Sequence, residues 1–176
     1  MKRLMFALAM LAAGAASAQA FKPGLWELTN KVKTGNAQTD QGISKMLEQM
    51  ANLPPEQRAQ MEAMMKQNGV SMPKAGSDGS MVITGCITPE MAARKEPPLG
   101  QKGKCTSKTD QVAGGMNLSF SCTDPSSSGQ GTLRFNGDSS YVMNMTIHSG
   151  EPGLPRTMQM ESTGRWLSAT CPAKPN

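Results

Sequence analysis

Sulfur-containing side chains are the most unusual groups in this sequence that could take part in chemistry. The chain of 176 residues holds 16 methionines and four cysteines but a single histidine. Thioethers are soft ligands for Cu(I), and they also pack adaptably against varied apolar partners. The methionines could therefore bind a metal, bind an apolar partner or fill a core.

The single histidine, His148, limits the catalytic arrangements that the chain can form. Any Ser-His-Asp or Cys-His arrangement would have to use it. The segment Met143-x-Met145-x-x-His148 contains soft ligands of the kind found in copper sites. A regular strand, however, sends the two thioethers and the imidazole to opposite faces. We therefore expect His148 to be a solvent-facing strand residue and not a metal ligand.

Glu27 and Glu161 are the candidate pair of catalytic carboxylates. They lie in the first and the last predicted strands, which a closing sheet could bring together. A glycosidase-type pair also needs a cleft with aromatic platforms, and only 4% of the residues are aromatic. We interpret both as polar-face residues, paired with Lys31 or Arg165. Without a GxSxG, HExxH or glycine-rich phosphate motif, we expect a non-enzymatic protein with no cofactor.

The four cysteines predict two disulfides and not a zinc site, because Cys86 and Cys105 lack the short spacing of zinc ligands. Two predicted strands flank a Val-Ala-Gly-Gly turn. If they pair directly on either side of it, Cys105 lies opposite Cys122, within reach of a bridge. Four cysteines allow three pairings, and by elimination we pair Cys86 with Cys171.

The first 20 residues have the layout of a secretory signal peptide. A basic start is followed by a short apolar run and by Ala18-Gln19-Ala20, small residues that favour cleavage after Ala20. The run is too short to cross a bilayer, which needs about 20 apolar residues. We expect residues 1–20 to be a signal peptide and residues 21–176 a single periplasmic domain without a transmembrane segment. Its cysteines would meet an oxidising compartment.

Charge argues against nucleic acid as a partner. Removing the signal peptide takes away two of the 18 basic residues and leaves 16 against 13 acidic ones. No stretch concentrates the positive charge, and aromatic rings for base stacking are scarce. We therefore expect no nucleic-acid binding.

Two helices are predicted after the first strand. The first has Asp40 as its N-cap. Pro54-Pro55 separate the two, since proline is tolerated at the first helical position. The two elements form a methionine-rich helical hairpin over about residues 40–69. Apolar residues recur on one stripe of each helix: Ile43, Met46, Leu47 and Met50 on the first, and Met61, Met64 and Met65 on the second.

A period of two elsewhere predicts about seven antiparallel strands. They cover residues 24–32, 81–87, 105–111, 116–122, 131–136, 140–149 and 156–167. Between the fifth and sixth strands we prefer a loop centred on Gly137-Asp138-Ser139 to a two-residue turn, because it keeps Phe135 on the same face as Tyr141. Gly164 suggests a bulge in the last strand.

The predicted sheet has one apolar face and one face of mostly Ser, Thr, Asn and Lys. The apolar face needs a cover, and the hairpin is the candidate. We expect an α+β fold: a curved antiparallel sheet of about seven strands, with the hairpin inserted after the first strand and packed on the apolar face. A groove between them would be lined by Met46, Met50, Met61, Met64, Met65, Met143, Met145, Met158 and Met160.

Several segments together resemble a known family. They are Lys22-Pro23-Gly24-Leu25-Trp26-Glu27, the methionine-rich Pro-Pro-Glu-Gln helix, Cys86-Ile87-Thr88-Pro89-Glu90, the Cys105 and Cys122 pair, and Gly164-Arg165-Trp166 before Cys171. They resemble a family of small exported proteobacterial proteins known as domain of unknown function three-six-one-seven. The resemblance implies a periplasmic location, and it brings no activity, cofactor or catalytic residue.

Three functional hypotheses follow. The leading one is a non-enzymatic periplasmic module that holds an apolar ligand, either a lipid-like molecule or an unfolded or partner segment, between the sheet and the hairpin. The second is Cu(I) binding or buffering by clustered thioethers, with Met61, Met65, Met158 and Met160 as candidate ligands. The third is an envelope interaction module without a small ligand. An open groove, converging sulfurs or a filled core would distinguish them.

Overall fold

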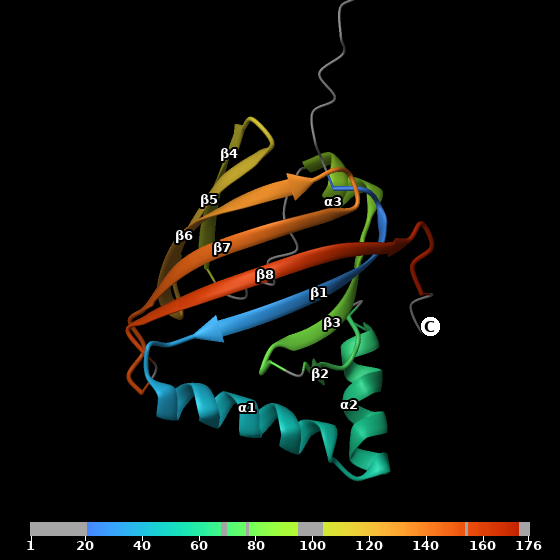
Figure 1. The fold of residues 1–176 in the computed structure, drawn as a ribbon, viewed down its shortest axis with the longest axis vertical. Helices are drawn as coiled ribbons and strands as arrows, with labels where there is room; N and C mark the ends of the chain where they lie inside the picture. The colour runs from blue at the N-terminus through green and yellow to red at the C-terminus, as the bar shows by residue number, and fades with distance from the viewer. Residues whose placement is uncertain (1–20, 68–69, 77, 95–103, 154, 173–176) are drawn as a thin grey trace, which may run out of the picture.

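The computed structural model describes residues 21–67, 70–76, 78–94, 104–153 and 155–172, so the predicted signal peptide lies outside the described residues. Within them, one antiparallel sheet of eight strands dominates, in the order β2-β3-β1-β8-β7-β6-β5-β4. The sheet curls strongly without closing, and three helices accompany it (Figure 1). None of the helices in this part of the chain combines the length and the apolar character that crossing a membrane requires.

The seven predicted strands are all present, and β2 is an eighth. The strands are β1 (Gly24–Lys33), β2 (Lys74–Ala75), β3 (Met81–Ile87), β4 (Cys105–Val112), β5 (Gly115–Thr123), β6 (Ser126–Asn136), β7 (Ser140–Ser149) and β8 (Thr157–Ser168). The helices are α1 (Ala37–Ala51), α2 (Pro55–Gln67) and α3 (Pro89–Arg94). With only two residues, β2 is too short to carry a periodic pattern, which is why the sequence did not indicate it.

Strands β4 to β8 form a meander, and β1 completes it by pairing with both β8 and β3. In the β4–β5 hairpin Cys105 lies opposite Cys122, in the register that the sequence predicted. Between β6 and β7, Asn136 pairs with Ser140, which leaves a three-residue loop with Gly137 at φ +71°. Phe135 therefore pairs with Tyr141 on one face, and the parity argument for this loop is confirmed.

Glycines on the inner face let aromatic rings lie against the backbone of the sheet. A Cβ atom at Gly164 would sit 2.0 Å from Cε1 of Tyr141, and one at Gly129 would sit 2.3 Å from Cε1 of Phe120. A glycine in a strand commonly marks such a close approach. Gly164 is therefore a packing position, and the irregularity of the last strand lies three residues further on. Leu25 pairs with Ser168 and Trp26 with Trp166, so the pairing skips Leu167 of β8.

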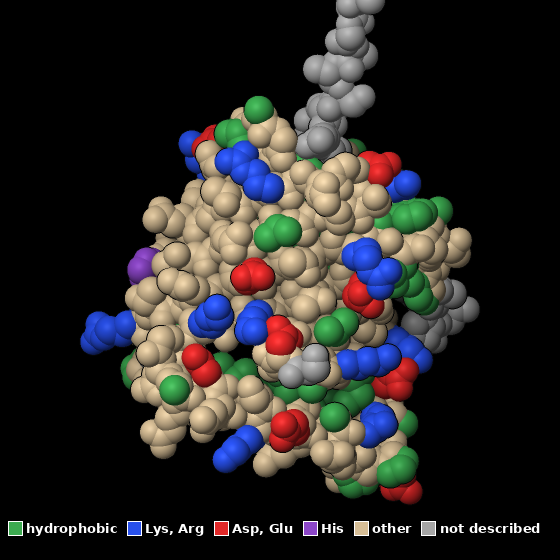
Figure 2. All heavy atoms as spheres, viewed as in Figure 1, with side chains coloured by type: hydrophobic (Ala, Val, Ile, Leu, Met, Phe, Trp, Pro, Cys, Tyr) green, Lys and Arg blue, Asp and Glu red, His purple; other side chains and the backbone are tan. Residues whose placement is uncertain are grey.

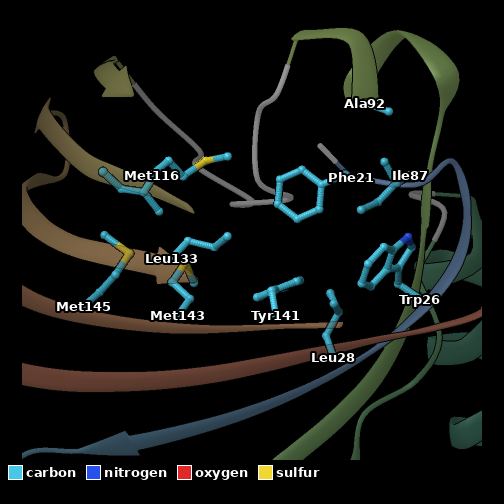
Figure 3. Close-up of a cluster of buried hydrophobic side chains, with 11 residues drawn as sticks. Phe21, Trp26, Leu28, Ile87, Ala92, Met116, Leu133, Tyr141, Met143 and Met145 are labelled. Atoms are coloured by element: carbon cyan, nitrogen blue, oxygen red, sulfur yellow. The ribbon is translucent and has the colours of Figure 1, made fainter. Parts of the chain in front are cut away.

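The inner face of the curled sheet is filled by its own side chains and by Phe21, as Figure 3 shows. Phe21 is 2% exposed and lies between the Met116–Leu133 side of the sheet and the Ile87–Trp26 side. Its ring packs edge-on against those of Trp26, Phe135 and Tyr141, with centroids 5.2–6.0 Å apart. The apolar face predicted from the sequence is this inner face. The sequence did not indicate that Phe21 belongs to it.

Helix α3 closes one end of this core. It begins with Pro89 at its first position, and the Thr88 hydroxyl accepts a hydrogen bond from the Met91 amide at 3.2 Å. Ala92 is buried and Met91 packs against the core cluster. The core therefore needs no cover from α1 and α2.

The prediction that the methionine-rich helices pack on the apolar face is wrong. Helix α1 lies beyond the β2 end of the sheet, and α2 turns away from α1 at a corner, so they do not form a hairpin (Figure 1). Leu47 is the one buried residue of α1, and α2 buries none of its 13 described residues. The physical reason is that the curled sheet buries its apolar face against itself.

The N-terminus of α1 also differs from the prediction. The helix begins at Ala37, and the N-cap is Asn36, whose side chain accepts from the Gln38 and Thr39 amides. Asp40 lies in the first turn and accepts hydrogen bonds from the amide and hydroxyl of Thr34, at 2.9 and 2.8 Å. These bonds hold the pKa of Asp40 below its usual range. At the other end of the predicted hairpin, residues 68–69 lie outside the described residues.

Two disulfides join the cysteines in the pairs that the sequence predicted. Cys105–Cys122 crosses the β4–β5 hairpin, with Cα atoms 4.0 Å apart. Cys86–Cys171 links β3 to the segment after β8, with Cα atoms 5.6 Å apart. The second bridge closes a much longer loop, with a sequence separation of 85 against 17.

Candidate functional site

The two candidate catalytic carboxylates lie apart. Strands β1 and β8 are neighbours, but Glu27 pairs with Arg165 in the register while Glu161 pairs with Lys31. Four strand positions separate the two glutamates, about 13 Å along the strands, which is longer than the carboxylate separations of glycosidases. Arg165 Nη2 lies 2.9 Å from Glu27 Oε1, so Glu27 belongs to a surface ion pair.

His148 and the methionines near it face opposite sides of β7. Met143 and Met145 are each 3% exposed in the core, whereas His148 is exposed and its Nδ1 lies 3.2 Å from Thr157 Oγ1. Strand parity separates these groups as predicted. Among the described residues, no group of three or more His, Cys, Asp or Glu side chains is arranged to hold a metal ion.

The predicted thioether cluster is not assembled either. Met158 and Met160 lie on β8, in the middle of the sheet order, whereas Met61 and Met65 lie on α2. The bridge between Val70 and Gly85 places the segment just after α2 beside β3, which β1 separates from β8. The candidate Cu(I) ligands therefore come from separate parts of the molecule.

The nine methionines proposed to line one groove fall into two separate groups. Met143 and Met145 are buried core residues, Met160 packs against that core, and Met158 is half-buried. The other five lie on the two helices, where Met50, Met61 and Met65 are half-buried and Met46 and Met64 are exposed. The two groups do not face each other, so they do not line a common groove between helices and sheet.

The five helix methionines nevertheless form a distinct feature, which we call the methionine surface: Met46, Met50, Met61, Met64 and Met65. Met46 is 53% exposed and Met64 is 60% exposed. Figure 2 shows hydrophobic side chains at the surface among charged ones in the lower right, where α2 lies in Figure 1. Met46 lies on α1 and Met64 on α2, so the exposed apolar side chains come from both helices. Groups of such side chains at a surface often mark an interaction site.

Local interactions hold α2 in place without burial. Pro55 occupies its first position and Glu56 its first turn, where the helix dipole favours a negative charge. Lys66 Nζ lies 3.0 Å from Glu62 Oε1, and the Arg58 guanidinium donates to the Ala51 carbonyl of α1. Such contacts are each worth only a few tenths of a kcal/mol, about 0.3–0.5 for an i,i+4 pair. A helix of this length usually needs a buried apolar face as well.

A second surface lies on the outer face of the sheet, which the sequence indicated only as a solvated polar face. A shallow groove of about 570 Å³ crosses six strands, from β1 to β4 through β8, β7, β6 and β5. Amide and hydroxyl side chains are the most frequent in its lining, and Lys31 lies at its β1 end. The alternate polar positions of the strands are the signal from which its residues could have been found.

A network of charges fixes the β1 end of this surface. Lys31 Nζ lies 2.8 Å from Asp78 Oδ2, and the Ser80 amide donates to the other oxygen of Asp78 at 3.2 Å. The bonds from Lys31 and Ser80 hold the pKa of Asp78 well below its usual range. Asp78 therefore stays ionised under ordinary conditions and keeps Lys31 oriented.

Comparison with known proteins identifies relatives without a known activity. A family model described as "Protein of unknown function (DUF3617)" matches residues 21–171. A Pseudomonas putida protein described as "Uncharacterized protein in lpd-3 5'region" is 41% identical over 122 residues, which cover 66% of this chain and 79% of the relative. No solved structure gives a significant match.

Proposed function

Because this chain belongs to the DUF3617 family of proteins of unknown function, we propose a role from its own surfaces: it is a non-enzymatic binding module of the periplasm. The methionine surface on α1 and α2 holds an apolar segment of a partner protein. This keeps the apolar partner expected from the sequence but places it on the helices, outside the sheet.

The observation that carries this proposal is that α2 has no buried residue among those described. Its three methionines, Met61, Met64 and Met65, lie in the second half of a helix in which none of the 13 described residues is buried. Burial of such a stripe is the usual source of stability for a short helix. Methionine is also the side chain that adapts best to apolar partners of different shape. A partner segment packed on the stripe would supply the missing burial.

Location and the absence of catalysis are parts of the same proposal. Two disulfides, one of them closing a long loop, favour an oxidising compartment, as does the signal-peptide layout of residues 1–20. A non-enzymatic role is supported by the ion pair at Glu27 and by the exposed position of His148 on a strand. Glu27 is held by the Arg165 guanidinium, and His148 Nδ1 lies beside the Thr157 hydroxyl.

The test uses a permanently unfolded probe, reduced and carboxymethylated α-lactalbumin, with the mature chain of residues 21–176. We expect the wild type to bind it with a Kd of about 1–100 μM. Replacing Met46 and Met64 together by Gln should weaken binding about tenfold, because the polar amides keep the side-chain length but lose the apolar contact.

Val142→Gln is the matched control, because Val142 is also exposed, at 42%, but lies on the outer face of β7. It should bind the probe like the wild type. Failure of the wild type to bind, or an equal loss in the Val142 variant, would reject the methionine surface as the binding site.

A further inference from the structure

The groove on the outer face of the sheet has an ordered polar lining. In the register, Thr132 of β6 lies between Asn144 of β7 and Asn117 of β5. Two residues away from Thr132 on β6, Gln130 lies between Thr146 of β7 and Ser119 of β5. Directly opposed side chains of an antiparallel pair lie about 4.5–5.5 Å apart at Cβ. The groove therefore presents two parallel rows in which amides and hydroxyls alternate from strand to strand.

The charges around these rows cancel. Lys31 and Lys33 lie at the β1 end, with Glu161 beside them on β8 and Asp110 at the β4 end. Asp110 is paired with Lys108 at 3.0 Å, and Lys31 with Asp78. Figure 2 faces this side of the sheet and shows a mostly uncharged surface with separate charged side chains. A ligand gains no net electrostatic attraction here, so a neutral one fits best.

The position of the groove argues against an extended peptide. Peptides that bind to sheets usually add a strand at an edge, where backbone groups are free to pair. This groove crosses β8, β7, β6 and β5, whose backbone groups are already paired with neighbours on both sides. Recognition here must come from side chains alone.

The chemistry of the lining also argues against lipids and nucleic acids. Lipids need apolar walls, whereas the outer-face side chains of the lining are amides, hydroxyls and charged groups. Leu118, Met145 and Met160 also line the groove, but Leu118 and Met145 are buried in the core and Met160 packs against it. Nucleic acids need net positive charge and stacking rings, and no aromatic residue lines the described groove. Amides and hydroxyls both donate and accept hydrogen bonds, as the hydroxyls of a sugar do.

We propose that this groove binds an extended, uncharged oligosaccharide laid across the strands. The strand spacing of about 4.8 Å is close to the length of one sugar unit in an extended β-linked chain. Successive units would then meet Asn144, Thr132 and Asn117 in turn. Because the lining lacks an aromatic ring for stacking, the affinity rests on hydrogen bonds and is low. This inference is independent of the methionine surface.

The test is an NMR titration of the 15N-labelled mature chain with chitohexaose, the uncharged β-1,4-linked hexamer of N-acetylglucosamine. We expect side-chain amide shifts at Asn117, Gln130 and Asn144, with a Kd of about 0.1–5 mM. The monomer N-acetylglucosamine should bind at least about tenfold more weakly, because it can meet only one strand position at a time.

Thr132→Ala and Asn144→Ala should each weaken hexamer binding about two- to tenfold, the effect of one lost hydrogen bond. Thr163→Ala is the matched control: it removes an exposed outer-face hydroxyl of β8 outside the groove lining, and it should leave the Kd unchanged. Amide spectra of all variants report folding directly. No shifts up to about 10 mM hexamer, equal binding of the monomer, or an equal effect of the control would overturn the proposal.

Discussion

The inner core of the sheet and the α1–α2 corner use the same side chain in opposite ways. Met143 and Met145 are 3% exposed and packed among aromatic and aliphatic neighbours, whereas Met46 and Met64 are more than half exposed. The core is also held by strand pairing and by two disulfides. The corner is joined to the sheet mainly through contacts of α1 with the short strand β2.

This contrast shows that an apolar stripe of the right period does not reveal what covers it. In the sheet, the stripe is covered by the rest of the same sheet. On α2, the stripe has the same residue type but lies at the surface. Stability should therefore depend on the core, and binding on the corner. The following predictions test this division, from the largest expected effect to the smallest.

Phe21→Ala should lower the free energy of unfolding by about 3–5 kcal/mol, because it leaves a cavity among three aromatic rings. Chemical denaturation of the mature chain measures it. Burial raises the pKa of Tyr141, the single tyrosine, whose ring centroid lies 5.5 Å from that of Phe21.

In the Phe21→Ala variant, water can reach the phenol, so absorbance titration should show the pKa of Tyr141 moving back toward its ordinary value. The raised pKa also means that Tyr141 stabilises the wild type below its unfolded pKa, and that this stability is lost as the pH rises through the folded pKa. A variant as stable as the wild type would contradict the place of Phe21 in the core.

Replacing both Cys105 and Cys122 by Ala should lower the free energy of unfolding by about 3 kcal/mol, from the chain entropy of a loop with a separation of 17. The same model gives about 4.5 kcal/mol for the Cys86–Cys171 bridge, with a separation of 85. Denaturation under oxidising and reducing conditions checks both values. If reduction leaves the wild type unchanged, the bridges do not constrain the unfolded chain.

Leu47→Ala should cost about 2–3 kcal/mol, since Leu47 is the one buried residue of α1. Met64→Ala, in the neighbouring helix, should change the stability by less than about 0.5 kcal/mol. Native-state hydrogen exchange separates the two outcomes. In the Leu47→Ala variant, the amides of α1 should exchange through a local opening of the helix, before the amides of the sheet exchange. A large effect of Met64→Ala would mean that α2 is packed more tightly than its exposure indicates.

Asp78→Asn tests the charge network at the β1 end of the outer groove. The folded-state pKa of Asp78 lies below its usual value, so the group stabilises the fold above about pH 3.9 and loses this contribution as the pH falls toward the folded pKa. The variant should therefore be slightly less stable than the wild type at pH 6, and the two should converge on acidification. Thermal denaturation between about pH 2.5 and 6 measures the difference in stability between the variant and the wild type. A constant difference over that range would exclude the ion pair as its cause.

Much of the sheet could be predicted because its signals are local. Alternation in each strand identified the inner face, and parity across residues 135–141 selected the three-residue loop between β6 and β7. Symmetric pairing around one turn placed Cys105 opposite Cys122. Each of these inferences depends on residues close together in one strand or one hairpin.

The two surfaces that we propose as binding sites could not be predicted in the same way. The sequence predicted that the nine methionines line two sides of one groove. Periodicity shows which residues share a face of a helix or strand, but it does not show how far apart two such faces lie. The polar outer face looked like ordinary solvated surface, although its positions line up across six strands. Phe21 looked like the first residue after a cleavage site, and its ring lies in the core.

The sequence by itself determined seven of the eight strands that the structure describes, the two longer helices, the face of each strand and the Cys105–Cys122 register, since a residue's neighbours within a few positions set its periodicity and its turn chemistry. The tertiary structure decided how far the sheet curls, and therefore that its apolar face is buried against itself and that the helix methionines lie outside. Curvature depends on contacts such as Tyr141 over Gly164 and Phe21 among three rings, between residues far apart in the chain. No local pattern encodes such contacts.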